Sequence, residues 1–215
     1  MTHLASITLG VADAEAAQHF YTTAFGLGPG SPVRLRTVEE PTSGFRGFTL
    51  ALTVSRPSDV DALVDASLAT GAVPLKPATR SLWGYGGVVR APDGAIWKIA
   101  TASKKDTGPA TGTIDEIVLL LGVEDVKASK QFYVGRGLAV AKSFGGKYVE
   151  FAAGATAAAA PVKLALYKRR SLAKDLGVAA EGTGSHRIVL GGSAGSFTDP
   201  DGFAWEAAAL APSSS

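Results

Sequence analysis

Two stretches of the chain show a strand-like apolar run followed by a helix-like pattern. The runs at 5–11 and 114–123 are rich in aliphatic and β-branched residues, which favour extended backbone. Each run is followed by an aspartate, Asp13 or Asp125. Its carboxylate can accept from the free backbone N–H groups at the start of a helix. We therefore predict a strand and then a helix at both places.

Both predicted helices end in a Phe-Tyr pair. The apolar residues behind the two aspartates recur at helical spacing and lead to the pairs at 20–21 and 132–133. This spacing places the aromatic rings on one face of each helix. We predict that these rings pack against a sheet as part of the core and do not line a binding site.

The same order of motifs recurs along the chain, which indicates an internal duplication. The Leu-Gly-Val segments at 9–11 and 121–123 stand at the same distance from their Phe-Tyr pairs. Each half then closes on a Pro-Asp-Gly turn followed by a strand with a tryptophan, at 91–98 and 199–206. We predict two modules, a polar linker between them and a short tail. Their bounds are 1–101 for the first module, 102–112 for the linker, 113–211 for the second module and 212–215 for the tail.

Composition excludes several classes of function. The 21 basic and 19 acidic side chains leave a formal net charge of +2, which is too small for a general attraction to nucleic acid. There is no cysteine, so a disulfide, a thiolate nucleophile and a Cys-ligated zinc ion are excluded. No apolar stretch reaches the length of a membrane span, and the first residues lack a secretory signal. We therefore expect a cytoplasmic protein that binds neither nucleic acid nor membrane.

Together these motifs resemble a known family. The Leu-Gly-Val strand, the Asp-capped helix ending in Phe-Tyr and the closing Pro-Asp-Gly-x-x-Trp strand are similar to the βαβββ module of the vicinal oxygen chelate superfamily. This superfamily contains glyoxalases, bleomycin-resistance proteins and extradiol dioxygenases, and the segment at 83–87 is similar to uncharacterised glyoxalase-like members. The resemblance implies an α+β fold of two βαβββ-type modules, whose curved mixed sheets enclose a cleft for a small-molecule ligand. It is compatible with a monomer or a homodimer.

The two halves depart from a full module in complementary ways. The first half keeps an amphipathic helix at 57–71 but is short between 28 and 45. The second half has a longer middle, with strands predicted at 147–152 and 162–167. It then passes from 188–190 to the closing hairpin with no matching helix. We therefore expect the two walls of the cleft to differ.

The resemblance implies metal ligands on the first strand, on a later strand and at the end of the last strand. In the first half these positions fall on Ser6, near Phe48 and on Lys98. None of these side chains suits a divalent ion. We expect no metal site in the first half.

The second half offers a histidine with two carboxylates. Its first-strand position is Val118, but Glu116 lies two residues earlier on the same strand face. His186 and Glu206 occupy the later-strand and last-strand positions. Glu116, His186 and Glu206 therefore form a candidate metal site.

These side chains also have an interpretation without a metal. Glu206 can be paired with a basic neighbour, for which Arg187 or Lys98 would serve. His186 can be a half-buried strand residue bonded to the backbone. Both interpretations stay open at the level of sequence.

Aromatic and polar side chains at related positions can line a metal-free cleft instead. Trp83 and Tyr85 stand among glycines and can offer flat faces to a ring, and Tyr148 shares a strand face with Glu150. Lys98 adds a cation. The predicted lining consists of Trp83, Tyr85, Lys98, Tyr148, His186 and Glu206.

Three functional hypotheses follow from these residues. The leading one is a small-molecule-binding protein with a metal-free cleft and no cofactor. The alternative is an enzyme, a metal-dependent lyase, isomerase or dioxygenase that holds a divalent ion with Glu116, His186 and Glu206. The third is an interaction protein whose cleft is filled by its own side chains.

Overall fold

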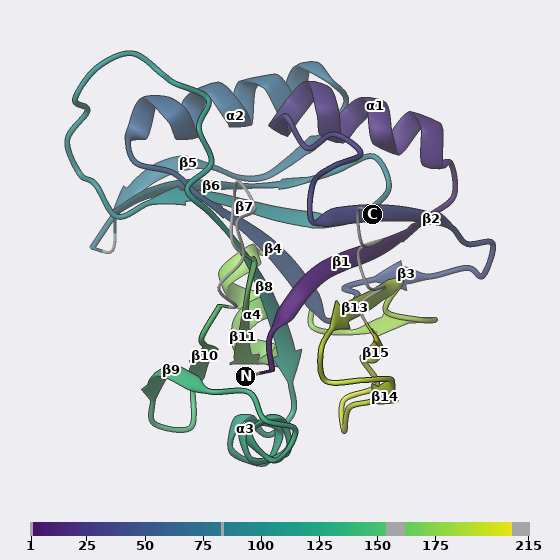
Figure 1. The fold of residues 1–215 in the computed structure, drawn as a ribbon. Helices are drawn as coiled ribbons and strands as arrows, with labels where there is room; N and C mark the ends of the chain where they lie inside the picture. The colour runs from purple at the N-terminus through teal and green to yellow at the C-terminus, as the bar shows by residue number, and fades with distance from the viewer. Residues whose placement is uncertain (1, 83, 154–161, 208–215) are drawn as a thin grey trace, which may run out of the picture.

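The computed structural model describes residues 2–82, 84–153 and 162–207, which form two large mixed β-sheets, one short two-stranded ladder and the helices packed on them (Figure 1). The larger sheet has eight strands. In sheet order they are β5 (Val73–Ser81), β6 (Gly84–Arg90), β7 (Ile96–Thr101), β4 (Phe48–Thr53), β8 (Glu116–Val123), β11 (Val162–Lys168), β10 (Tyr148–Phe151) and β9 (Val140–Phe144).

Two complete βαβββ units build the larger sheet. One runs β4-α2-β5-β6-β7, with α2 at Pro57–Ala69, and the other runs β8-α3-β9-β10-β11, with α3 at Val126–Gly135. In each unit the last strand lies beside the first. The first strands, β4 and β8, pair antiparallel at the centre of the sheet. The predicted α+β fold of βαβββ units in mixed sheets is confirmed.

The smaller sheet joins the two ends of the described chain. Its five strands are, in order, β14 (Phe197–Thr198), β15 (Ala204–Ala207), β13 (Ile188–Gly192), β1 (Leu4–Val11) and β2 (Val33–Thr37). β1 pairs antiparallel with β13 and parallel with β2. Both sheets therefore take strands from both halves of the chain. The predicted linker at 102–112 lies between β7 and β8, outside any helix or strand.

The remaining elements are two helices and a short two-stranded ladder. α1 (Ala14–Phe25) follows β1 and lies beside α2 (Figure 1). α4 (Arg169–Leu176) follows β11, and a short ladder joins β3 (Ser43–Gly44) to β12 (Gly182–Thr183). The helix predicted at 57–71 is confirmed as α2, and no helix stands between β13 and β14 in the described chain. α4 is a helix that the sequence patterns did not predict.

The predicted aspartate caps are confirmed. Asp13 Oδ1 accepts from the backbone N–H groups of Glu15 and Ala16, each at 3.0 Å. Asp125 Oδ1 accepts from the N–H groups two and three residues ahead, at 2.8 and 3.1 Å. These bonds satisfy donors that have no partner inside the helix, so each cap marks where its helix begins.

A buried chain of hydrogen bonds holds each aromatic helix to its closing strand. Tyr21 OH donates to Asp93 Oδ2 at 2.6 Å and accepts from Trp97 Nε1 at 3.4 Å. The second half repeats this chain, at 2.6 and 3.3 Å, through Tyr133, Asp199 and Trp205. Burial, and then the neighbouring aspartate, raise the pKa of both tyrosines. The core position predicted for the Phe-Tyr pairs is confirmed, with Phe132 only partly buried.

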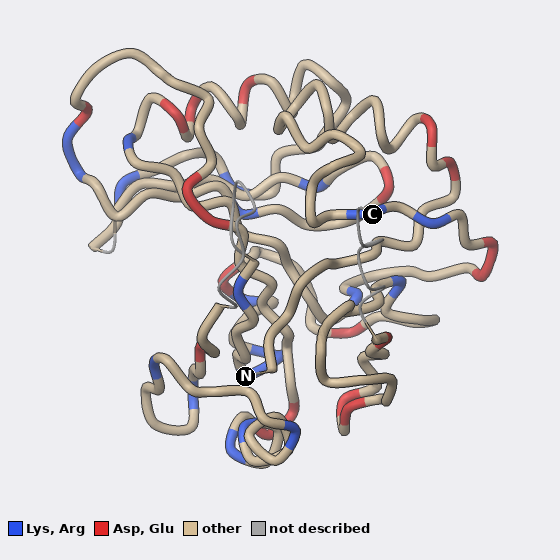
Figure 2. Tube along the Cα trace, viewed as in Figure 1, with Lys and Arg blue, Asp and Glu red and all other residues tan. Residues whose placement is uncertain are grey.

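Charged residues of both signs are interspersed along the chain (Figure 2). This distribution agrees with the small formal net charge of +2. Among the described residues, no helix has both the length and the apolar character that crossing a membrane requires.

Candidate functional site

The smaller sheet turns one face to the core and the other to a pocket. Strand residues alternate between faces, and the register places Thr8 opposite Val189 and Val189 opposite Ala204. These three residues, here called the pocket floor, line a pocket of about 240 Å³. Four of their strand neighbours face the core and are at most 2% exposed: Ile7, Leu9, Leu190 and Trp205.

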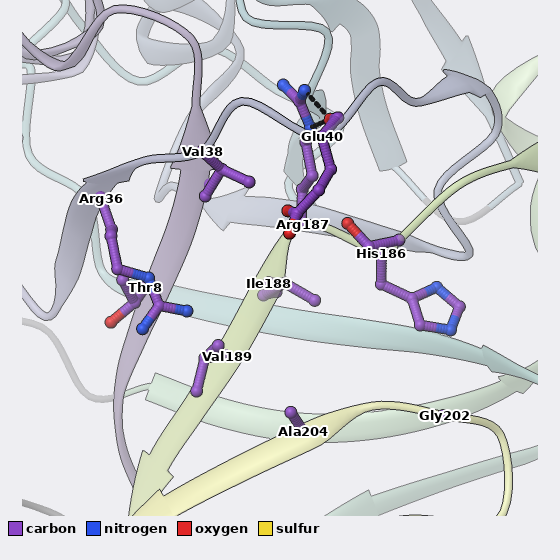
Figure 3. A pocket seen from close by; sticks show the side chains of 12 residues that line it. Thr8, Arg36, Val38, Glu40, His186, Arg187, Ile188, Val189, Gly202 and Ala204 are labelled. Atoms are coloured by element: carbon purple, nitrogen blue, oxygen red, sulfur yellow. Dashed lines mark hydrogen bonds between the residues drawn. The ribbon is translucent and has the colours of Figure 1, made fainter.

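The pocket walls carry charged groups. Arg36 and Val38 stand on one side of the floor, and Glu40, His186 and Arg187 stand near its other end (Figure 3). The floor itself has only short side chains, so the strands are left uncovered between these walls. A pocket of this volume has room for several water molecules or one small ligand.

Arg36 is the cation on the β2 wall. Its Nη1 lies 3.5 Å from Glu206 Oε1 of β15, and the two side chains are 53% and 58% exposed. The basic partner of Glu206 is thus Arg36, and not Arg187 or Lys98. Because both groups are in contact with water, the pair is weak.

His186 is held by backbone on both sides. Its Nδ1 lies 2.6 Å from the carbonyl oxygen of Arg46, and its Nε2 lies 3.0 Å from the carbonyl oxygen of Asp201. The ring also stacks on Phe203, with 4.1 Å between the ring centroids. Both ring nitrogens therefore face carbonyl oxygens, of which a neutral imidazole can donate to one. The ring points away from Thr8 and Arg36 (Figure 3).

Arg187 combines an unusual backbone with a fixed side chain. Its φ is 51°, and no other residue except glycine has a positive φ in the described chain. Its Nε donates to the carbonyl oxygen of Glu40 at 3.1 Å, and its Nη2 donates to the same oxygen (Figure 3). Backbone strain of this kind often accompanies functional sites, because surrounding contacts must hold it.

Solved structures with a similar arrangement exist. Glyoxalase I from Zea mays matches with a TM-score of 0.62 at 16% sequence identity, over 95% of this chain and 91% of that chain. A candidate dioxygenase from Bacillus subtilis matches with a TM-score of 0.52 at 12% identity, over 88% of this chain and 69% of that chain. The chain has the fold of the vicinal oxygen chelate superfamily. No family model and no curated protein matches its sequence.

Within the vicinal oxygen chelate fold, the side chains predicted to line one cleft lie apart. Tyr85 OH donates to Asp61 of α2 at 2.6 Å, so this ring lies on the face of the larger sheet that α2 covers. Lys98 lies on the opposite face, where its Nζ contacts Asp175 of α4 at 2.7 Å. Trp83 lies outside the described residues. Of the six predicted residues, His186 lines the smaller-sheet pocket. Glu206 contacts Arg36, which also lines this pocket.

Tyr148 belongs to a separate charged cluster on the larger sheet. Its OH donates to Glu150 Oε2 at 2.9 Å, and Lys163 Nζ lies 3.5 Å from Glu150 and 2.5 Å from Glu116. Burial, and then the bond to Glu150, raise the pKa of Tyr148. Burial opposes the charged form of Glu150, but the Tyr148 bond and the charges of Lys163 and Lys142 outweigh it and lower its pKa. Each charge here already has a partner within the cluster.

α4 covers part of the same face of the larger sheet. Leu172 and Leu176, both at most 1% exposed, belong to a small apolar cluster with Phe45, Val88 and Ile96. Lys98 occupies the last-strand position that the superfamily resemblance associates with a metal ligand. Here the Nζ of Lys98 instead forms an ion pair with Asp175 of α4.

Many members of this superfamily hold a divalent metal, but the side chains present here do not fit one. Glu116 and Glu206 stand on different sheets, and Lys163 already binds Glu116. The two nitrogens of His186 are turned to carbonyl oxygens. Across residues 2–82, 84–153 and 162–207, no three His, Asp or Glu side chains are grouped closely enough to hold an ion. The structure thus does not bring together the predicted set of Glu116, His186 and Glu206.

Sequence reasoning missed Arg36 and the pocket floor, and it named Arg187 only as a possible partner of Glu206. A signal for Arg36 was present, because Arg34-Leu35-Arg36 alternates and places both arginines on the outer face of a strand. No local signal existed for the floor, because β1 and β13 come from opposite ends of the chain and meet only through long-range pairing.

Proposed function

We propose that this protein binds a small molecule in the smaller-sheet pocket without a metal ion. The observation that carries the proposal is the sheet face of short side chains, which leaves about 240 Å³ between charged walls. Concave sites with a few placed polar groups are the usual places for small ligands. The strained backbone of Arg187 at the same pocket adds support.

The larger sheet supports the same choice by contrast. Its corresponding face is covered in part by α4 and in part by the paired charges around Glu150. The smaller sheet has no helix on its pocket face in the described chain. We therefore assign the ligand to the smaller sheet.

The test uses three probes of similar size that differ in charge: benzoate, benzamide and benzylamine. We expect at least one of them to shift the backbone amide signals of Gly10 and Gly191 saturably in ¹H–¹⁵N NMR spectra. Ala204→Leu should abolish this response, because the longer side chain fills the pocket floor. Ala207→Leu, at an exposed position at the end of the same strand, is the control and should keep it. No response to any probe, or one that survives Ala204→Leu, contradicts the proposal.

The enzyme alternative is separated by metal titration. We expect Ni²⁺, Zn²⁺, Mn²⁺ and Fe²⁺ to leave the melting temperature of the protein unchanged, because its donors are not gathered. A stoichiometric ion with a melting shift that Glu206→Ala abolishes would instead favour a metal-dependent lyase, isomerase or dioxygenase.

A further inference from the structure

We infer that the ligand of this pocket carries a carboxylate, which binds Arg36 in place of the Glu206 side chain. The inference rests on the proposed function, because it concerns the same pocket. It adds the chemical class of the ligand and gives Glu206 the role of an internal competitor.

The surroundings of Arg36 leave its guanidinium accessible from the pocket. Its register partner on β1 is Gly10, which has no side chain to cover it. A Cβ at Gly10 would lie 2.9 Å from Val38 Cγ2 and 3.2 Å from Arg187 Cβ. A larger residue there would therefore push against Val38 and Arg187, which both line the pocket. The accessibility of Arg36 itself is shown by its side chain, which is 53% exposed.

The present partner of Arg36 is easily displaced. Glu206 makes one contact at 3.5 Å, and both side chains are more than half exposed. A guanidinium can bind both oxygens of a carboxylate through two parallel hydrogen bonds, and such pairs are stronger than single contacts. A ligand carboxylate that approaches from the pocket can form both bonds while Glu206 turns to water.

The charge at the far end of the pocket also favours an anion. The guanidinium of Arg187 is bound by the carbonyl oxygen of Glu40, which carries no full charge. The carboxylate of Glu40 also borders the pocket, but this residue is exposed and water screens it. With Glu206 displaced, the pocket is bordered by two guanidinium groups, those of Arg36 and Arg187, and by one carboxylate, that of Glu40.

The experiment measures dissociation constants of benzoate and benzamide, which have the same shape and differ in charge. We expect benzoate to bind wild type about tenfold more tightly than benzamide, and Arg36→Gln to remove this preference. Glu206→Gln should tighten benzoate binding severalfold and leave benzamide binding unchanged, because the competing charge is gone. Arg170→Gln, an equal change of charge at an exposed position of α4, is the matched control and should have no effect.

The outcomes separate this inference from the proposed function. If benzamide or benzylamine binds the pocket as tightly as benzoate, or if Glu206→Gln weakens benzoate binding, the inference is wrong while the binding proposal stands. If no probe binds, both fail. Melting curves of each variant confirm that it is folded, which is expected because Arg36 and Glu206 are exposed.

Discussion

Arg187 shows how a single residue can store strain next to a pocket. A non-glycine residue in the left-handed region costs about 1–2 kcal/mol, because its Cβ crowds the following carbonyl oxygen. Here φ is 51°, and the preceding His186 is fixed by two carbonyl contacts. The side-chain bonds to Glu40 then hold Arg187 from the other side. The strained residue is thus secured by its neighbours.

This strain can be measured with two substitutions that remove the same guanidinium. We expect Arg187→Ala to be less stable than Arg187→Gly by about 1 kcal/mol, because only glycine adopts the left-handed region freely. Urea unfolding of the two variants isolates the backbone contribution, since both lose the bonds to Glu40. If the alanine variant is as stable as the glycine variant, the backbone at this position is not strained.

Tyr133 carries a buried hydroxyl group, which donates to the carboxylate of Asp199 at 2.6 Å. Tyr133→Phe should destabilise the protein at pH 7 by about 1–3 kcal/mol, because a buried acceptor loses its donor. Desolvation by burial raises the pKa of Asp199. The native state therefore binds a proton more readily than the unfolded chain does. The stability contributed by Asp199 falls as the pH rises from its unfolded pKa, about 3.9, through its folded pKa.

The loss in Tyr133→Phe should accordingly be smaller near pH 4 than at pH 7, because the protonated carboxyl no longer needs a strong donor. Urea unfolding of wild type and Tyr133→Phe at the two pH values measures this loss of unfolding free energy. Equal losses at both pH values would show that the bond from Tyr133 does not stabilise the charged form of Asp199.

At the scale of elements, α4 is a short helix held by what it covers. Eight residues are too few for a stable isolated helix, so packing must supply its stability. Leu176 is fully buried in the small apolar cluster on the larger sheet. Lys76 Nζ donates to the carbonyl oxygen of Lys174 at 3.2 Å, near the helix end. α4 therefore depends on the sheet beneath it.

Leu176→Ala should cost about 2–5 kcal/mol of unfolding free energy, because it leaves a cavity under α4. Leu82→Ala is the matched control, since Leu82 is 85% exposed and its truncation should change little. Urea unfolding measures both. Probe binding to the folded Leu176→Ala variant should persist, because the pocket lies on the other sheet. A loss as small as that of Leu82→Ala would mean that α4 does not bury this side chain.

The elements that the sequence predicted are those with local signals. Asp13 and Asp125 bond the first N–H groups of their helices, and such bonds depend on residues two and three positions away. α4 had weaker signals, a Leu172–Leu176 pair one turn apart and Gly177, which takes φ of 77° at the helix end. Its stability comes from a sheet face distant in sequence, which no short pattern reveals.

The candidate site was less predictable for the same reason. Alternation along a strand gives the face of Lys98 relative to its neighbours, but it does not say that α4 lies on that face. Likewise, Glu206 was identified as a candidate, but its partner Arg36 lies 170 residues away in sequence. Pairing between distant strands decides which predicted side chains meet.

At the scale of the whole molecule, two incomplete parts complete each other. β1, α1 and β2 open the first half without the further strands of a full βαβββ unit. β13, β14 and β15 close the second half without a helix among them. These two parts pair through β1 and β13, while the two complete units pair through β4 and β8. Each half therefore presents two unpaired strand edges to the other.

This arrangement predicts that the two halves fold only together. We expect separate fragments 1–104 and 105–215, cut between two exposed lysines, to be largely unfolded alone, because β1, β4, β8 and β13 each lose a paired neighbour. Mixing them should restore a single cooperative transition in circular dichroism. The midpoint should rise with concentration, since folding is now coupled to association. The intact chain, whose midpoint should not depend on concentration, is the control. A stable monomeric fragment 1–104 would show instead that the pairing of β4 with β8 and of β1 with β13 adds little to the fold.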